Sequence, residues 1–153
     1  MSRKFFFWIR GGFGGGYYIG VYKGMVERWG YKELQKKKYY GVSAGSIMAL
    51  YILLGLTWEQ LDNEFISISH SSKKNGIFLK ASYYHNKSLE KFLYKDAYKK
   101  ISGKLFIGVT NFYGNLSVIS KWKSDKDLID TIHASMNIPY YCGSFTNRLN
   151  NKR

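Results

Sequence analysis

Two strand–turn–helix units within residues 5–55 constrain the fold of this chain more than any other feature. In the first unit, an apolar run at residues 5–9 ends in the glycine-rich turn at residues 11–16, and a helical stretch follows. In the second unit, a short strand leads through Gly41-Val42-Ser43-Ala44-Gly45 into an apolar helix at residues 46–54. Apolar runs of strand length that end in glycine are typical of buried strands in a parallel sheet.

The remaining segments favour a layered α/β domain. Thr57-Trp58-Glu59-Gln60 reads as a capping box that opens a helix, and we expect this helix to end near Ser67, before a polar loop. Residues 104–112 and 116–122 alternate as two strands of a hairpin. The order of elements predicts one α/β domain over residues 1–153, with a mostly parallel sheet and helices on both of its faces.

The charge of the chain is strongly basic. Its 24 Lys and Arg residues outnumber its 10 Asp and Glu residues, which gives a net charge of +14. Such a surface attracts phosphate-bearing partners such as nucleic acid or an anionic membrane, although lysine runs also serve simply as solvated faces. No recognisable nucleic-acid-binding module is present, so we expect no nucleic-acid partner.

Cysteine content and hydropathy limit the site chemistry and the compartment. Cys142 is the only cysteine, so no internal disulfide is possible, and no Cys/His spacing resembles a zinc site. We therefore expect no metal and no cofactor. The apolar run near the N-terminus is too short for a signal peptide. Residues 39–58 carry no charge and are long enough to span a membrane, but their glycines and serines favour a strand–turn–helix. These features favour a cytoplasmic or peripheral-membrane protein.

The two turns indicate acyl-transfer chemistry. A serine in a G-x-S-x-G turn between strand and helix has its hydroxyl exposed at a helix N-terminus, although small residues at this place also simply let a helix pack on a sheet. The glycine-rich turn offers converging backbone amides that can stabilise a developing oxyanion. Phosphate loops are less consistent with this turn, because it lacks the Lys-Ser/Thr pair and the glycine spacing that such loops require.

These residues resemble the patatin-like phospholipase family. In that family a glycine-rich oxyanion loop precedes a G-x-S-x-G nucleophile by about thirty residues, and here Gly12 and Ser43 lie 31 positions apart. The run at residues 12–21 is similar to the adipose-lipase branch. The segment His133-Ala134-Ser135-Met136-Asn137-Ile138-Pro139 resembles the Ala-Ser…Pro segment of the family.

The resemblance implies a patatin-like fold and a lipid acyl hydrolase that needs no cofactor. Its substrate would be a lipid at a membrane or lipid-droplet surface, and its oligomeric state is not predicted. The resemblance also assigns Ser43 as the nucleophile. The implied oxyanion hole comprises the amides of Gly11, Gly12 and Phe13, and the remaining motif residues of the loop and the elbow are Gly14, Gly15, Gly41, Ala44 and Gly45.

The sequence departs from the family at two places. Arg10 stands where the loop has its first glycine. The family activates its serine with an aspartate in an Asp-Gly-Gly/Ala motif after the Ala-Ser…Pro segment, but residues 140–153 contain no Asp or Glu. We therefore expect a domain truncated before this motif.

Three functions stay open at this point. The chain is a lipid acyl hydrolase, a non-catalytic patatin-like domain that binds lipid or a partner, or a membrane protein that spans at residues 39–58. A triad built from His133 and an aspartate at position 125, 127 or 130 is less favoured, because these aspartates suit a helix N-terminus. His70 and His85 are expected on the surface, in polar and lysine-rich surroundings.

Overall fold

The computed structural model describes residues 4–7, 12–111, 113–138 and 142. Its strands are β1 (Lys4–Phe7), β2 (Lys38–Val42), β3 (Leu105–Thr110) and β4 (Leu116–Ile119). Its helices are the 3-10 turn η1 (Gly12–Gly15), α1 (Gly16–Trp29), α2 (Tyr31–Leu34), α3 (Ala44–Leu54), α4 (Trp58–Asn75), α5 (Ala81–Phe92), α6 (Ala97–Ile101) and α7 (Asp125–Met136).

The sheet is mostly parallel, as the sequence predicts. Its strand order is β1-β2-β3-β4, and β1, β2 and β3 pair in parallel while β4 pairs antiparallel with β3. The β3–β4 pair confirms the predicted hairpin, with Thr110 opposite Leu116. The α/β class and the order of strand, turn and helix in the first two units are therefore confirmed.

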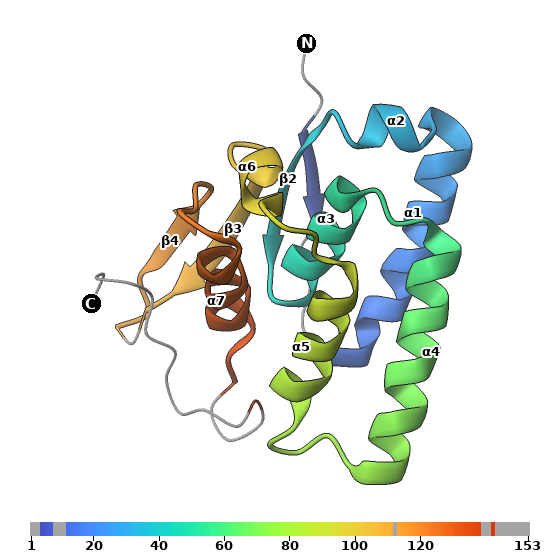
Figure 1. The fold of residues 1–153 in the computed structure, drawn as a ribbon, viewed down its shortest axis with the longest axis vertical. Helices are drawn as coiled ribbons and strands as arrows, with labels where there is room; N and C mark the ends of the chain where they lie inside the picture. The colour runs from blue at the N-terminus through green and yellow to red at the C-terminus, as the bar shows by residue number, and fades with distance from the viewer. Residues whose placement is uncertain (1–3, 8–11, 112, 139–141, 143–153) are drawn as a thin grey trace.

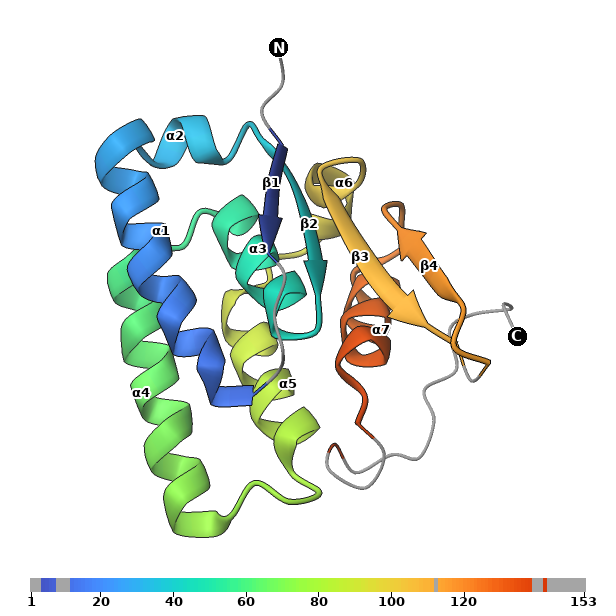
Figure 2. The same cartoon turned by 180° about the vertical axis from the view of Figure 1, so that it is seen from behind.

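The helices that contact the sheet cover one of its faces. Helix α3 packs on β2 and β3, and α7 packs on β3. Both lie on the same side of the strands in Figures 1 and 2, while the packed pair α1 and α4 lies beyond the β1 edge. The prediction of helices on both faces is not confirmed in the described residues. Because the order β1-β2-β3 runs in one direction, right-handed crossovers bring their connections to the same face.

The other face of the sheet is open over β2, β3 and β4. The rings of Tyr40 and Phe106 stack there with centroids 4.4 Å apart. Val42, Leu116 and Val118 are exposed. A Cβ placed on Gly108 would meet Val42 and Leu116 side chains, which puts these residues on one face.

Helix α3 is the centre of the hydrophobic core. Every residue from Gly45 to Leu53 is buried, and Leu50 and Ile52 are fully enclosed. Gly55 ends the helix in a left-handed conformation at φ 92°, which glycine adopts at little cost. The uncharged stretch at residues 39–58 is thus a strand, a turn and an eleven-residue helix, and among the described residues no helix combines the length and apolarity needed to cross a membrane.

Helix α4 is longer than the sequence predicts. The capping box is present, since Gln60 N–H donates to Thr57 Oγ1 and Thr57 N–H donates to the Gln60 side chain. The helix nevertheless continues past Ser67 to Asn75. Its inward face carries a buried serine, Ser72, after the last apolar residue, and the Ser72 hydroxyl donates to the carbonyl of Ser69. Hydrophobic periodicity detects a helix only where apolar residues occupy its buried face. Because a serine occupies the buried face at the end of α4, the periodicity does not indicate that the helix continues.

A leucine truncation tests whether α3 holds the core together. We expect Leu50→Ala to lower the free energy of unfolding by about 2–5 kcal/mol, because Leu50 is fully buried and its removal leaves a cavity. The matched control Leu116→Ala, at a position 64% exposed, should change it by less than about 1 kcal/mol. Denaturant titration measures both, and equal losses in the two variants would contradict this packing.

Candidate active site

Ser43 occupies a strained turn between β2 and α3. Its backbone has φ 55° and ψ −131°, a region that residues other than glycine seldom adopt. Such conformations cost on the order of 1–3 kcal/mol and persist only where the surroundings enforce them. The residue stands at the N-terminus of a buried helix, where the helix dipole favours negative charge.

The close approach of two backbone segments explains why this turn needs glycine. A Cβ on Gly41 would lie 2.6 Å from the carbonyl oxygen of Gly45 and 2.6 Å from the amide nitrogen of Ser46. No side chain fits at these distances, since both contacts are with backbone atoms. The first and last glycines of the motif therefore face each other, and the strand passes directly against the first turn of the helix.

Hydrogen bonds fix the main chain of the turn. The N–H of Ser43 donates to Ser135 Oγ at 2.9 Å, and the Ser135 hydroxyl donates to the carbonyl of Gly108 at 2.6 Å. The Ser46 hydroxyl donates to the carbonyl of Ser43 at 2.6 Å. Ser135 thereby links α7, β3 and the turn. Ser135 lies in the segment that resembles the Ala-Ser…Pro stretch, but its contact is 92 residues away in the chain, so local patterns give no sign of it.

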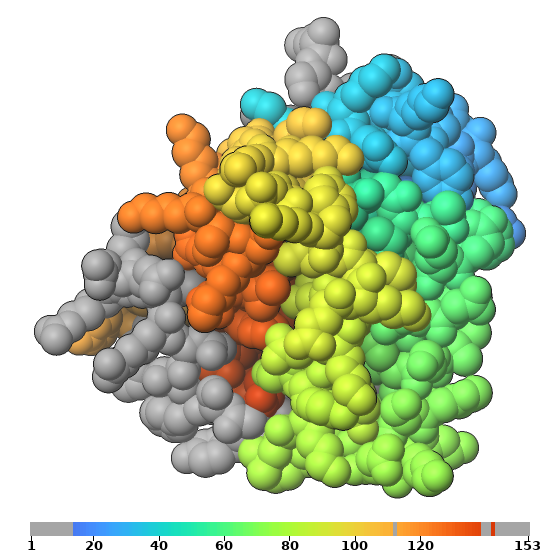
Figure 3. Space-filling view, viewed as in Figure 1, coloured from blue at the N-terminus to red at the C-terminus, as the bar shows by residue number. Residues whose placement is uncertain are grey.

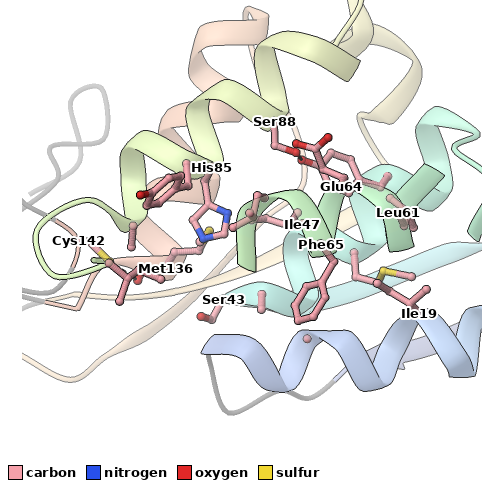
Figure 4. Close-up of a pocket in the computed structure, with 18 of the residues that line it drawn as sticks. Ile19, Ser43, Ile47, Leu61, Glu64, Phe65, His85, Ser88, Met136 and Cys142 are labelled. Atoms are coloured by element: carbon pink, nitrogen blue, oxygen red, sulfur yellow. Dashed lines mark hydrogen bonds between the residues drawn. The ribbon is translucent and has the colours of Figure 1, made fainter. Parts of the chain in front are cut away.

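Ser43 lines an apolar cavity of about 150 Å³. An apolar space of that size holds a small hydrocarbon group. In the view of Figure 4, Ser43 lies near the end where Met136 and Cys142 are found, and Leu61 and Ile19 lie at the other end. The walls come mainly from α3, α4 and α5, three consecutive helices that follow Ser43 in the chain.

The glycine-rich loop lies beside this turn. Gly11 falls outside the described residues, and Gly12 and Phe13 belong to the η1 turn, which contacts α3. Gly15 lines the cavity, and a Cβ placed on it would lie 3.9 Å from the Cβ of Ala44. Gly14 is exposed. The structure thus brings the two turns together, while the assignment of the Gly11, Gly12 and Phe13 amides as an oxyanion hole stays a prediction.

His85 lies in the cavity, and its predicted place on the surface is wrong. Its imidazole points from α5 into the pocket (Figure 4). Burial, together with the nearby His133, lowers the pKa of His85 to about 4, so the ring is neutral at neutral pH. From the sequence, the pattern Ser88-Leu89-Glu90-Lys91 predicts a helix that begins at Ser88, but α5 begins at Ala81. Its inward stripe of Ala81, Tyr84, His85 and Ser88 lacks the aliphatic residues that reveal a helix.

The aspartates near His133 have structural roles. The carboxylate of Asp125 accepts from the amides of Asp96 at 2.7 Å and Tyr98 at 2.9 Å. Asp127 accepts from the amide of Lys123, and Asp130 pairs with Lys126 at 2.7 Å. These contacts agree with the expected role of these carboxylates at the start of a helix and on its solvated face.

The acidic residue that lines the cavity is Glu64, and it already has a partner. Its carboxylate forms an ion pair with Lys91 at 2.6 Å. In the part of the chain that the structure describes, no three His, Cys, Asp or Glu side chains gather into a group that could hold a metal ion.

A glycine substitution tests the close approach in the turn. We expect Gly41→Ala to destabilise the fold by about 1–3 kcal/mol or more, because the added methyl group meets backbone atoms that must move. Gly24→Ala is the control: this exposed position in α1 has nothing within 4 Å of an added Cβ, so alanine should stabilise the helix by about 0.5–1 kcal/mol. Thermal or denaturant unfolding reports both, and an unaffected Gly41→Ala protein would refute the close approach.

The pH dependence of stability tests the burial of His85. Between about pH 6.5, the ordinary pKa of histidine, and pH 4, the unfolded chain takes up a proton on His85 that the folded chain does not. The free energy of unfolding should therefore fall as the pH falls through this window, by up to about 1.4 kcal/mol per pH unit. His85→Gln should reduce this dependence without abolishing it, because burial also lowers the pKa of His133. The exposed His70→Gln control should keep the full dependence, and equal slopes in both variants would show that the pKa of the partly buried His85 is not lowered.

Comparison with known proteins gives consistent matches. The family model described as "Patatin-like phospholipase" matches residues 11–150. Human "Patatin-like phospholipase domain-containing protein 2" is 31% identical over 138 residues, which cover 86% of this chain and 27% of the relative. No solved structure matches the chain.

Two further relatives carry the names of acyl-transfer enzymes. Mouse "Omega-hydroxyceramide transacylase" is 27% identical over 69% of this chain and 19% of its own length. A human 1-acylglycerol-3-phosphate O-acyltransferase is 26% identical over 86% of this chain and 29% of its own length. The chain thus spans 19% to 29% of the length of these curated relatives. Because the family model covers nearly all of its residues, the chain belongs to the patatin-like phospholipase family.

Proposed function

We propose that this chain carries the nucleophile and the acyl pocket of a lipid acyl hydrolase. The observation that carries the proposal is the position of Ser43, whose strained turn at a helix N-terminus opens onto an apolar cavity. A serine at such a place has its hydroxyl beside a space that accepts hydrocarbon, and the helix N-terminus favours the negative charge that develops during acyl transfer.

The proposed reaction begins with attack of Ser43 Oγ on the carbonyl carbon of a fatty-acyl ester. The carbonyl electrons move to its oxygen, and the amides of Gly11, Gly12 and Phe13 bind this oxyanion. Collapse of the intermediate breaks the ester bond, and the departing alcohol takes the proton released by Ser43. Water then attacks the acyl-enzyme and releases the fatty acid. We assign no residue of this chain as the base, because the family aspartate has no counterpart in residues 140–153.

The cavity suggests the path of the acyl chain. From Ser43 the first part of the hydrocarbon chain, which is as much as a cavity of about 150 Å³ holds, would pass Phe65 toward Leu61 and Ile19 at the far end of the pocket in Figure 4. Burial of these apolar groups contributes roughly 0.8 kcal/mol per methylene. The substrate would be a phospholipid or acylglycerol at a membrane or lipid-droplet surface, which suits a cytoplasmic or peripheral-membrane protein.

The acyl acceptor is a separate part of the proposal. Two relatives are named for transfer of acyl groups to alcohols rather than to water. Both outcomes share the acyl-enzyme on Ser43 and differ in what attacks it. We propose water as the acceptor, and release of free fatty acid in the absence of an added alcohol is the outcome that distinguishes hydrolysis from transfer.

An activity-based probe tests the nucleophile. We expect an alkyl fluorophosphonate to label the folded protein at Ser43, because this serine stands at a helix N-terminus, which favours developing negative charge, and lines an apolar pocket that accepts the alkyl chain. Mass spectrometry of the digested protein identifies the labelled residue. Ser43→Ala should remove the label, whereas Ser117→Ala, at an exposed position of β4, should keep it.

The same experiment separates the hydrolase from the alternative. A non-catalytic patatin-like domain that holds lipid or a partner in this pocket would bind fatty acid and leave the probe unreacted. Label retained in Ser43→Ala, or no label on well-folded wild-type protein, would overturn the proposed nucleophile.

A further inference from the structure

The connection between α4 and α5 presents two large apolar side chains to solvent. Phe78 is 64% exposed and Leu79 is 52% exposed. Leu79 also adopts a left-handed backbone conformation, with φ 63°, which is uncommon for a residue other than glycine, asparagine or aspartate. The connection therefore keeps two hydrophobic side chains in water and holds one of them on an unfavourable backbone.

Hydrogen bonds hold this connection in a defined shape. The hydroxyl of Tyr84 lies 3.2 Å from the carbonyl oxygens of both Ser71 and Gly76, which share its proton. Lys80 Nζ donates to the carbonyl of Asn75 at 2.9 Å, at the C-terminus of α4. The exposure of Phe78 and Leu79 thus belongs to an anchored turn.

The segment that carries these apolar residues is basic. Residues 65–89 contain no Asp or Glu, although they include four lysines. These are Lys73, Lys74, Lys80 and Lys87, all exposed. None of the four forms an ion pair with another described residue. Two exposed apolar side chains in a segment that carries lysines and no acidic residue match an anionic lipid bilayer, in which hydrocarbon lies beneath negative headgroups.

The surface is continuous with the cavity. Ile77 and Ala81 line the pocket that contains Ser43, and they flank Phe78 and Leu79 in the chain. The α4–α5 connection forms the lower edge of the molecule in Figure 3, the same end toward which the β2–α3 turn points in Figure 1. Ile77 and Ala81 therefore connect this edge of the molecule to the pocket.

We propose that the α4–α5 connection docks the protein on an anionic lipid bilayer. Phe78 and Leu79 insert among the acyl chains, and Lys73, Lys74, Lys80 and Lys87 contact the headgroups. The delivery of lipid to Ser43 rests on the proposed function, but docking itself needs no catalysis. The two can therefore fail separately, because the inactive Ser43→Ala protein should bind vesicles as the wild-type protein does.

Vesicle cosedimentation measures the docking. Wild-type protein should bind phosphatidylcholine vesicles that contain phosphatidylserine more tightly than vesicles of phosphatidylcholine alone, and added salt should weaken this binding. Phe78→Ser with Leu79→Ser should reduce binding at least about tenfold, because two large apolar groups no longer enter the bilayer. The control pair Leu116→Ser with Val118→Ser removes two exposed apolar side chains of β4 and should bind as the wild-type protein does.

Charge reversal tests the cationic part. Lys73→Glu with Lys74→Glu should reduce binding by more than about twenty-five-fold, at roughly fivefold for each lost lysine. Lys99→Glu with Lys100→Glu makes the same change of net charge on the exposed face of α6 and should have a much smaller effect. Equal losses in the two pairs would overturn a local docking surface and leave only attraction by net charge.

Insertion has a direct optical readout. A nitrobenzoxadiazole fluorophore attached at Phe78→Cys, in a Cys142→Ser background, should shift to the blue and brighten on anionic vesicles as it enters hydrocarbon. The same fluorophore at Tyr113→Cys, an 85% exposed site in the β3–β4 turn, should not change. An unchanged signal at position 78 on bound vesicles, or no binding of vesicles by folded protein, would refute the proposal. Capture of an acidic protein in place of vesicles would do the same.

Discussion

The contact between the backbones of Gly41 and Gly45 is the constraint on which the rest of the site depends. A Cβ at position 41 would lie 2.6 Å from the carbonyl oxygen of Gly45. Only glycine, which has no side chain, therefore fits at position 41. Ser43 lies within this turn in its strained conformation, and the approach sets α3 directly against the sheet. The buried face of α3 then organises the core, and α4, α5 and α7 enclose the cavity around the serine.

The local features of this arrangement were predictable from the sequence. The G-x-S-x-G turn, the capping box at Thr57 and Gln60, and the β3–β4 hairpin each depend on residues close together in the chain, so their patterns are visible without a structure. The sequence also predicts that the two glycine-containing turns lie close together. Both follow the carboxyl ends of parallel strands, where open α/β sheets place their sites.

The missed features depend on contacts between distant parts of the chain. His85 and Ser135 have ordinary neighbours in sequence, and their roles come from packing of α5 against the pocket and of α7 against β3. The ends of α4 and α5 were misplaced because serine and histidine occupy inward positions where periodicity looks for aliphatic residues. The position of α3 and α7 on one face of the sheet follows from the order of the strands within the sheet. The order of the elements along the chain does not define this strand order.

The structure shows where the lysines and the exposed apolar residues lie relative to the cavity. The net charge of +14 says little by itself, since solvated lysines are common in any basic protein. The structure gathers an acid-free stretch, two exposed apolar residues and the cavity walls at one edge of the molecule. That arrangement connects the proposed chemistry to a lipid surface without any membrane-spanning helix in the described residues.

The central claim is that Ser43 and the apolar cavity act together as an acyl site. A crystal structure of the protein after reaction with a long-chain alkyl fluorophosphonate tests it most directly. Our account predicts a bond from phosphorus to Ser43 Oγ, a phosphonyl oxygen facing the amides of Gly12 and Phe13, and an alkyl chain that passes Phe65. Phosphorus bonded to another residue, or an alkyl chain outside the cavity, would contradict it.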